Sequence, residues 1–319
     1  MKKIISMLLA LTLLLGCMVP AALAEKKLSV VTTTFPIYDW VRQVIGTDES
    51  IELTLLLDSG VDLHSFNPTA ADIMRIATCD LFLYIGGESD DWVEDALSRA
   101  INADLRAVSL MEALGEAARE EEIVEGMQAE EEDDEDEEED PEYDEHIWLS
   151  LRNAQLFVQV IAEELSALLP EKTEIFQANA EAYIGQLAAL DLQYMSMTET
   201  AAHRTLLFGD RFPFRYLAED YGLDYYAAFS GCSAETEASF QTIVFLAGKV
   251  DELSLPAVLT IEGTDHRIAE TIVKSTKAQD QQILTVDSMQ GTTSGDVKSG
   301  ADYLKIMEKN LEVFSQALN

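Results

Sequence analysis

Short apolar runs alternate with amphipathic stretches through the first half of the chain. The apolar and β-branched runs predict strands at 28–36, 51–57, 81–85 and 107–110. Apolar residues at helical spacing between them predict helices at 38–45, 69–78 and 91–101. Thr69 is the expected N-cap of the second helix. Strands that alternate with helices predict a parallel sheet covered on both faces.

The same alternation returns in the second half of the chain. We expect strands at 205–208, 225–229, 258–261 and 283–286. We expect helices at 150–168, 214–221, 239–253, 268–276 and 302–318. A second parallel sheet therefore follows the first. A chain of 319 residues usually forms two hydrophobic cores rather than one.

One predicted helix, at 171–199, is longer than all the others. Its apolar residues recur at alternating spacings of four and three and form one stripe: Phe176, Ala180, Tyr183, Leu187, Leu190, Tyr194 and Met197. At 1.5 Å per residue it would span about 40 Å, enough to follow two small lobes. We predict an α/β protein of two lobes, each a parallel sheet flanked by helices. The lobes are expected at 28–170 and 201–319, with 171–200 as the linking helix and the binding site between the lobes.

Acidic residues are concentrated in one segment. The formal net charge is -38, and the segment from Glu120 to Glu145 holds 18 Asp or Glu and no Lys or Arg. Such a segment buries little apolar surface and repels itself, so an acidic disordered insertion is predicted at 120–145. Its carboxylates suit weak binding of calcium, magnesium or manganese. Nucleic acid is excluded as a partner, because phosphate binding needs positive charge.

The first 24 residues have the pattern of a secretory signal peptide, with Lys2 and Lys3 before an apolar run. Leu14-Leu15-Gly16-Cys17 reads as a lipobox, which predicts a lipid anchor on Cys17 and an extracytoplasmic protein exported by the Sec pathway. An ordinary cleavage site after Ala24 is the alternative and would release a protein that starts at Glu25. We favour the lipoprotein, because a cysteine at that position has no other use.

Two further cysteines lie far apart in the sequence. Cys79 falls in an apolar junction between a helix and a strand, and Cys232 falls in a loop that contains glycine. Cys79 is interpreted as a small buried apolar residue, so no disulfide is expected.

Two of the four histidines lie at the edges of predicted elements. His64 follows the 51–57 strand, at the end where open α/β sheets bind their ligands. His146 lies just before the 150–168 helix. A lone histidine is more often structural, but two in such positions favour a metal site. His203 and His266 are expected at the surface. The motifs H-E-x-x-H, G-x-S-x-G and C-x-x-C are absent from the sequence, so no enzyme is predicted.

Several segments together resemble the solute-binding proteins of zinc and manganese ABC importers. They are 30–39, the strand before His64, 80–87, 146–150, 216–223 and 283–287, and they cover nearly the whole chain in the family's order. The resemblance implies a cluster A-I type fold whose long helix limits hinge motion between the lobes. It also implies four metal ligands from loops of the two lobes, and it matches His64, His146 and Asp287 to three of them. For Asp287, capping of the following turn is the alternative.

The fourth ligand position departs from the family pattern. The resemblance places Arg211 where the family has His or Glu, and a guanidinium cannot bind a cation. Asp210 is the first candidate for the missing ligand, and a site with three protein ligands or with no metal is the alternative. Arg211 itself would then need a carboxylate partner, such as Glu262 or Glu237, and could clamp the lobes shut.

The predicted function is capture of a divalent transition metal, with Zn²⁺ first and Mn²⁺ second, for delivery to an ABC permease. The metal is cargo, and the protein is expected to be a monomer. A surface adhesin or a cation-buffering lipoprotein is the alternative, followed by a metal-dependent hydrolase. Calorimetric stoichiometry separates transport from buffering, because transport needs one tight site and buffering needs many weak ones.

Overall fold

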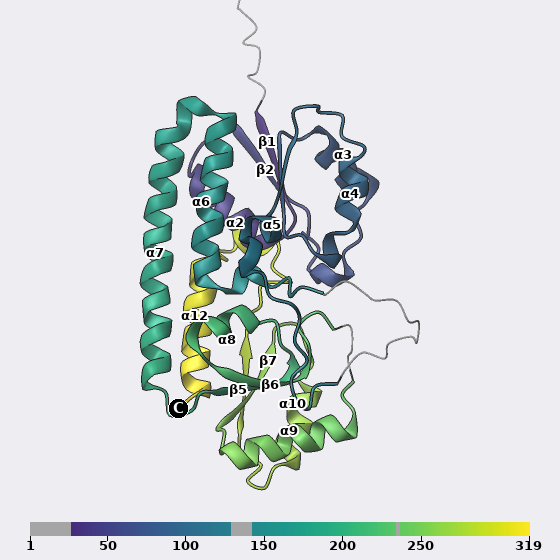
Figure 1. The fold of residues 1–319 in the computed structure, drawn as a ribbon, viewed down its shortest axis with the longest axis vertical. Coiled ribbons are helices and arrows are strands. Elements are labelled where there is room, and N and C mark those ends of the chain that lie inside the picture. Colours follow the sequence, from purple (N-terminus) through teal and green to yellow (C-terminus); the bar gives the residue numbers. More distant parts are fainter. Residues whose placement is uncertain (1–26, 129–141, 234–236) are drawn as a thin grey trace, which may run out of the picture.

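The structure, a computed structural model, describes residues 27–128, 142–233 and 237–319. The signal segment with Cys17 and Ala24 lies outside the described residues, as do residues 129–141 of the acidic segment. The described chain forms two lobes stacked along the longest axis, with one long helix beside both (Figure 1). Among the described residues, no helix is long and apolar enough to cross a membrane.

The N-terminal lobe is built on a parallel sheet in the order β2-β1-β3-β4. Its strands are β1 (Leu28–Thr32), β2 (Ile51–Leu55), β3 (Leu81–Tyr84) and β4 (Arg106–Ser109). Its helices are α2 (Phe35–Ile45), α3 (Ala70–Thr78), α4 (Trp92–Leu97), α5 (Leu110–Leu114) and α6 (Leu151–Leu168). The strands bury β-branched and apolar residues in a shared core, which is the signature of a parallel sheet covered on both faces.

The C-terminal lobe repeats this plan with a sheet in the order β6-β5-β7-β8, also parallel. Its strands are β5 (Thr205–Arg211), β6 (Asp224–Phe229), β7 (Ala257–Ile261) and β8 (Gln282–Val286). Its helices are α8 (Arg215–Tyr221), α9 (Phe240–Leu253), α10 (Arg267–Ser275), α11 (Ser294–Lys298) and α12 (Tyr303–Ala317). The predicted fold class, two α/β lobes with parallel sheets, is confirmed.

The long helix α7 (Thr173–Thr200) has 28 residues, which corresponds to about 42 Å. The predicted stripe is buried from Phe176 to Tyr194, and Thr198 rather than Met197 is its last buried residue. Tyr194 donates a hydrogen bond to the carbonyl of Met307 in α12, at 2.7 Å. Helix α7 also contacts α2 and α6 of the N-terminal lobe. One continuous helix therefore packs against both lobes.

Three local predictions have different outcomes. Thr69 caps α3 as expected: its side chain accepts the N–H of Asp72, and Asp72 in turn accepts the N–H of Thr69. The predicted 91–101 helix is shorter, because α4 ends at Leu97. Leu110 belongs to a short helix rather than a strand, since Ser109 caps α5 through the N–H of Glu112. Short turns with caps escape a search for long periodic patterns.

The prediction of disorder is wrong for the described ends of the acidic segment, 120–128 and 142–145. Glu120 pairs with Tyr143 in an antiparallel bridge. Gln128 donates its N–H to the carbonyl of Ala228 in β6, at 3.0 Å, and Met127 packs on the core. Apolar residues between the acidic ones, such as Met127, allow this docking. The prediction of disorder is based on the number of charges and does not consider them. This part of the chain therefore crosses from the N-terminal lobe to the C-terminal lobe.

Candidate metal centre

The ends of parallel strands from both lobes meet at one cleft. His64 lies in a 3-10 turn (Leu63–Ser65) beyond β2, and Asp62 caps that turn by accepting the N–H of His64 at 3.1 Å. The Nδ1 atom of His64 lies 2.8 Å from Oγ of Ser89, which follows β3. Two strand-end loops of the N-terminal lobe therefore fix the orientation of the His64 ring.

His146 lies directly before a second 3-10 turn (Ile147–Leu149) and is fully buried. Its Nδ1 lies 2.9 Å from the carboxylate of Asp144, which also accepts the backbone N–H of His146 at 2.8 Å. Because a carboxylate only accepts, Nδ1 carries the hydrogen, and Nε2 presents a lone pair when the ring is neutral. This carboxylate–histidine arrangement is the usual support of a metal-binding imidazole.

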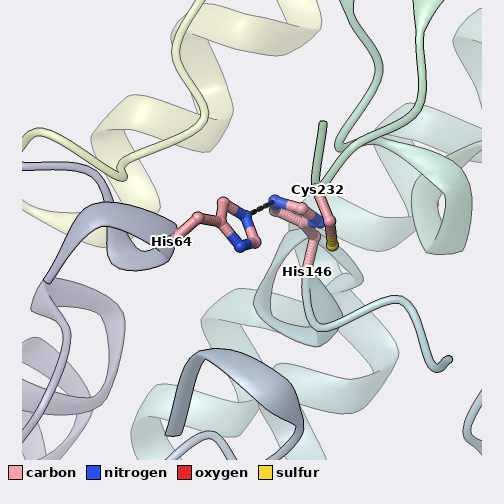
Figure 2. A group of neighbouring side chains, drawn as sticks. All are labelled: His64, His146 and Cys232. Carbon is pink, nitrogen blue, oxygen red and sulfur yellow. Dashed lines mark hydrogen bonds between the residues drawn. The ribbon is translucent and has the colours of Figure 1, made fainter. Parts of the chain in front are cut away.

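The two rings point toward each other, with the Nε2 atoms 3.3 Å apart (Figure 2). Since Nε2 of His146 accepts, Nε2 of His64 donates in this state, and Nδ1 of His64 then accepts the Ser89 hydroxyl. The structure thus brings together two of the four predicted ligands, from loops far apart in the sequence.

The electrostatics of the two rings differ. Burial and the neighbouring charge of His146 lower the pKa of His64 to about 4. Burial disfavours the protonated form of His146 and by itself would lower its pKa. The adjacent carboxylate of Asp144 outweighs this effect, so the pKa of the His146 ring is raised. Burial raises the pKa of Glu145, whose Oε2 lies 3.7 Å from Nδ1 of His64, to about 7. Because the pKa of His64 is lowered, its ring is neutral at ordinary pH and can act as a metal ligand.

Cys232 joins the two histidines in a group that the sequence analysis did not predict. One nitrogen from each ring and the cysteine sulfur all lie within 4.8 Å of one another. Cys232 follows β6, so it comes from the same edge of the C-terminal sheet as Asp210. Burial raises the pKa of the thiol, and the nearby carboxylates of Glu121 and Asp144 raise it further. Its place beyond a strand end was the one signal in the sequence.

Asp210 and Asp287 are not in this group, and each carboxylate already accepts hydrogen bonds in the C-terminal lobe. Asp210 accepts from three donors, namely the N–H groups of Arg211 and Ile261 and the hydroxyl of Thr264. Asp287 accepts the N–H of Met289 at 2.8 Å, which is the turn-capping geometry foreseen as its alternative role. Among the described residues, only His64, His146 and Cys232 form a group of this kind.

Arg211 pairs with a partner other than the two that were expected. Its Nη2 lies 2.7 Å from Oδ2 of Asp62, the residue that caps the His64 turn. Glu262 instead accepts from the N–H and hydroxyl of Ser288. The ion pair therefore joins the C-terminal lobe to the loop that carries His64.

The two remaining histidines and Cys79 do not belong to the three-residue group. His203 and His266 are partly exposed, and Nε2 of His266 lies 3.4 Å from the hydroxyl of Thr285. Cys79 is buried, and both Cys79 and Cys232 are free thiols. A cavity of about 500 Å³ opens beside His64 and is lined by Arg211, Thr264 and His266 among others.

Two parallel-sheet lobes joined by a long helix, with histidines at the strand ends between them, are the architecture of a solute-binding protein. The family described as ZnuA, zinc-uptake complex component A periplasmic, matches residues 30–317, and the chain belongs to this family.

Individual relatives agree with this assignment. The chain is 32% identical over 92% of its length to the zinc-binding lipoprotein AdcA of Streptococcus pneumoniae, but it spans only 56% of that protein. It is 28% identical to the high-affinity zinc uptake system protein ZnuA of Bacillus subtilis, covering 92% of this chain and 88% of the relative. The crystal structure of the Zn(II)-bound ZnuA-like domain of Streptococcus pneumoniae AdcA superposes with a TM-score of 0.70, at 28% identity, over 92% of this chain and 99% of the other.

Proposed function

We propose that the chain captures a divalent transition metal between its two lobes, with zinc first and manganese second, through His64 and His146. The separation of 3.3 Å between the two Nε2 atoms carries this proposal. Two nitrogens bound at about 2.0–2.1 Å to a tetrahedral zinc ion lie about 3.4 Å apart. The rings are thus held at nearly the spacing that a shared ion requires, and each Nδ1 is oriented by its own partner.

Zinc is placed first because AdcA is named a zinc-binding lipoprotein and its matching domain is Zn(II)-bound. The chain spans little more than half of AdcA, so the ion and the partners are proposed for this chain on its own residues. Asp287 stays a predicted ligand, and its carboxylate accepts one hydrogen bond, from the N–H of Met289. Asp210, the first candidate for the fourth position, accepts three hydrogen bonds within its own lobe, so it is the weaker of the two predicted carboxylate ligands.

The proposed recipient of the ion is the permease of an ABC importer. The protein is proposed to act as a monomer. A lipid on Cys17 is proposed to hold it at the outer face of the membrane. The lipobox motif supports the anchor, as does the word lipoprotein in the name of AdcA. Mass spectrometry of the N-terminus checks it: a diacylated Cys17 is expected, and a free Glu25 would contradict the anchor.

Calorimetric zinc titration of His64→Ala and His146→Ala tests the site. We delete 129–140 in every variant, including the reference, to remove weakly binding carboxylates while keeping the docked residues up to Gln128. Each alanine variant should lose tight binding almost completely, and His203→Ala is the matched control that should keep it. Tight binding unchanged in both site variants would falsify the proposed function.

A further inference from the structure

We propose that Cys232 is the third protein ligand of the ion held by His64 and His146, and that its sulfur makes the site favour zinc over manganese. This proposal rests on the proposed function and deepens it. Figure 2 shows Cys232 beside the His146 ring, on a different loop from either histidine. Imidazole and thiolate are the ligand types that zinc takes in proteins.

The spacing of the three side chains is close to that of a loaded site. With Zn–N near 2.1 Å and Zn–S near 2.3 Å, tetrahedral ligands are about 3.4–3.6 Å apart. One nitrogen of each ring and the sulfur are all within 4.8 Å of one another. Cys232 has one rotatable side-chain bond, so rotation of that bond can bring the sulfur toward an ion between the rings.

The backbone around Cys232 is built to hold this loop against His146. A side chain at Gly231 would meet the Cε1 and Nδ1 atoms of the His146 ring at 3.0 Å, so glycine allows the close approach. The N–H of Cys232 donates to the carboxylate of Glu121 at 3.1 Å. The docked part of the acidic segment therefore holds the loop from the other side.

Cys232 takes the ligand position that the sequence analysis gave to Asp210. The Asp210 carboxylate is engaged by three donors, two of them backbone N–H groups, and it lies outside the three-residue group. The two assignments predict opposite metal preferences. A carboxylate is a hard ligand that shifts relative preference toward manganese, whereas a thiolate is soft and shifts it toward zinc. On binding, the thiol proton leaves to solvent and the sulfur lone pair forms the bond to the metal.

Cobalt spectroscopy and metal competition test the assignment on the full chain. Cobalt(II) bound to the unsubstituted protein should show a sulfur-to-cobalt charge-transfer band in the near ultraviolet, and Cys232→Ser should lack it. Cys79→Ser is the matched control, since Cys79 is a buried free thiol that is not part of this group. It should keep the band.

Zinc affinity should fall at least about tenfold in Cys232→Ser, because loss of even a supporting partner costs 10–100-fold. Manganese affinity should change less, so the zinc-to-manganese ratio should fall. Absence of the charge-transfer band in the unsubstituted protein overturns the proposal even if Cys232→Ser folds poorly. If the histidine variants lose zinc while Cys232→Ser keeps its affinity, only the cysteine assignment fails. If all three keep it, the proposed function fails as well.

Discussion

The two lobes prepare the cleft in different ways. On the N-terminal side, His64 and His146 are oriented through Nδ1 by Ser89 and Asp144, so their Nε2 atoms point toward each other. On the C-terminal side, the strand-end carboxylates of Asp210, Glu262 and Asp287 all accept N–H groups from their own lobe. A position at a strand end therefore does not by itself make a ligand. The histidines differ from the carboxylates because their ring nitrogens approach one another closely enough to share an ion.

The largest effect should come from breaking the orientation of a histidine. In Asp144→Asn the charge opposite Nδ1 of His146 is lost, and an amide oxygen accepts more weakly. Zinc affinity should fall about 10–100-fold, measured by competition with a chromophoric chelator. Glu142→Gln, two residues before Asp144 in the same segment, is the control and should bind zinc normally. An affinity within twofold of the reference for Asp144→Asn would show that the His146 ring needs no such support.

Removal of a side-chain carboxylate in the C-terminal lobe should lower the stability of the fold rather than the zinc affinity. Asp210 is buried, and Asp210→Ala leaves its three donors without their acceptor. A loss of about 1–3 kcal/mol in the free energy of unfolding is expected, measured by denaturant titration. Zinc affinity of the folded variant should stay within a few-fold. If the stability is unchanged and the affinity collapses, Asp210 is the ligand after all and the contrast between the lobes is lost.

The smallest effect should come from the ion pair that spans the lobes. Asp62 and Arg211 are partly exposed, and such pairs contribute about 0.2–1 kcal/mol. In a double-mutant cycle of Asp62→Asn and Arg211→Ala, thermal unfolding should give a coupling energy in this range, and high salt should reduce it. The exposed pair Arg267–Asp265, within one turn of the C-terminal lobe, is the reference cycle. A coupling above about 2 kcal/mol would make this pair a latch between the lobes rather than a minor contact.

The fold could be predicted from the sequence because each element carries its own periodicity. The stripe on α7, the cap at Thr69 and the apolar strand runs are all local patterns, and each appears in the structure. His64 and His146 could be picked out because histidines are rare in this chain and these two flank regular elements.

The rest of the candidate site depends on contacts between distant residues. The Asp62 partner of Arg211 lies 149 residues away in the sequence, and no local pattern pairs them. The sequence placed Cys232 only in a loop that contains glycine, because its approach to His146 follows from the docking of separate loops. Spacing along a chain carries no such information.

The segment that carries His146 belongs by chain order to the N-terminal lobe but also makes three hydrogen bonds with the other lobe. Tyr216 donates to the carbonyl of Asp144, Trp148 donates to the carbonyl of Ser288, and Tyr303 donates to the carbonyl of Trp148. Contacts between residues so distant in sequence form slowly during folding. We therefore expect the group of His64, His146 and Cys232 to assemble late in folding, once both lobes are in place. A fragment cut at α7 would keep both histidines in its sequence but would lack Cys232 and these contacts with the C-terminal lobe.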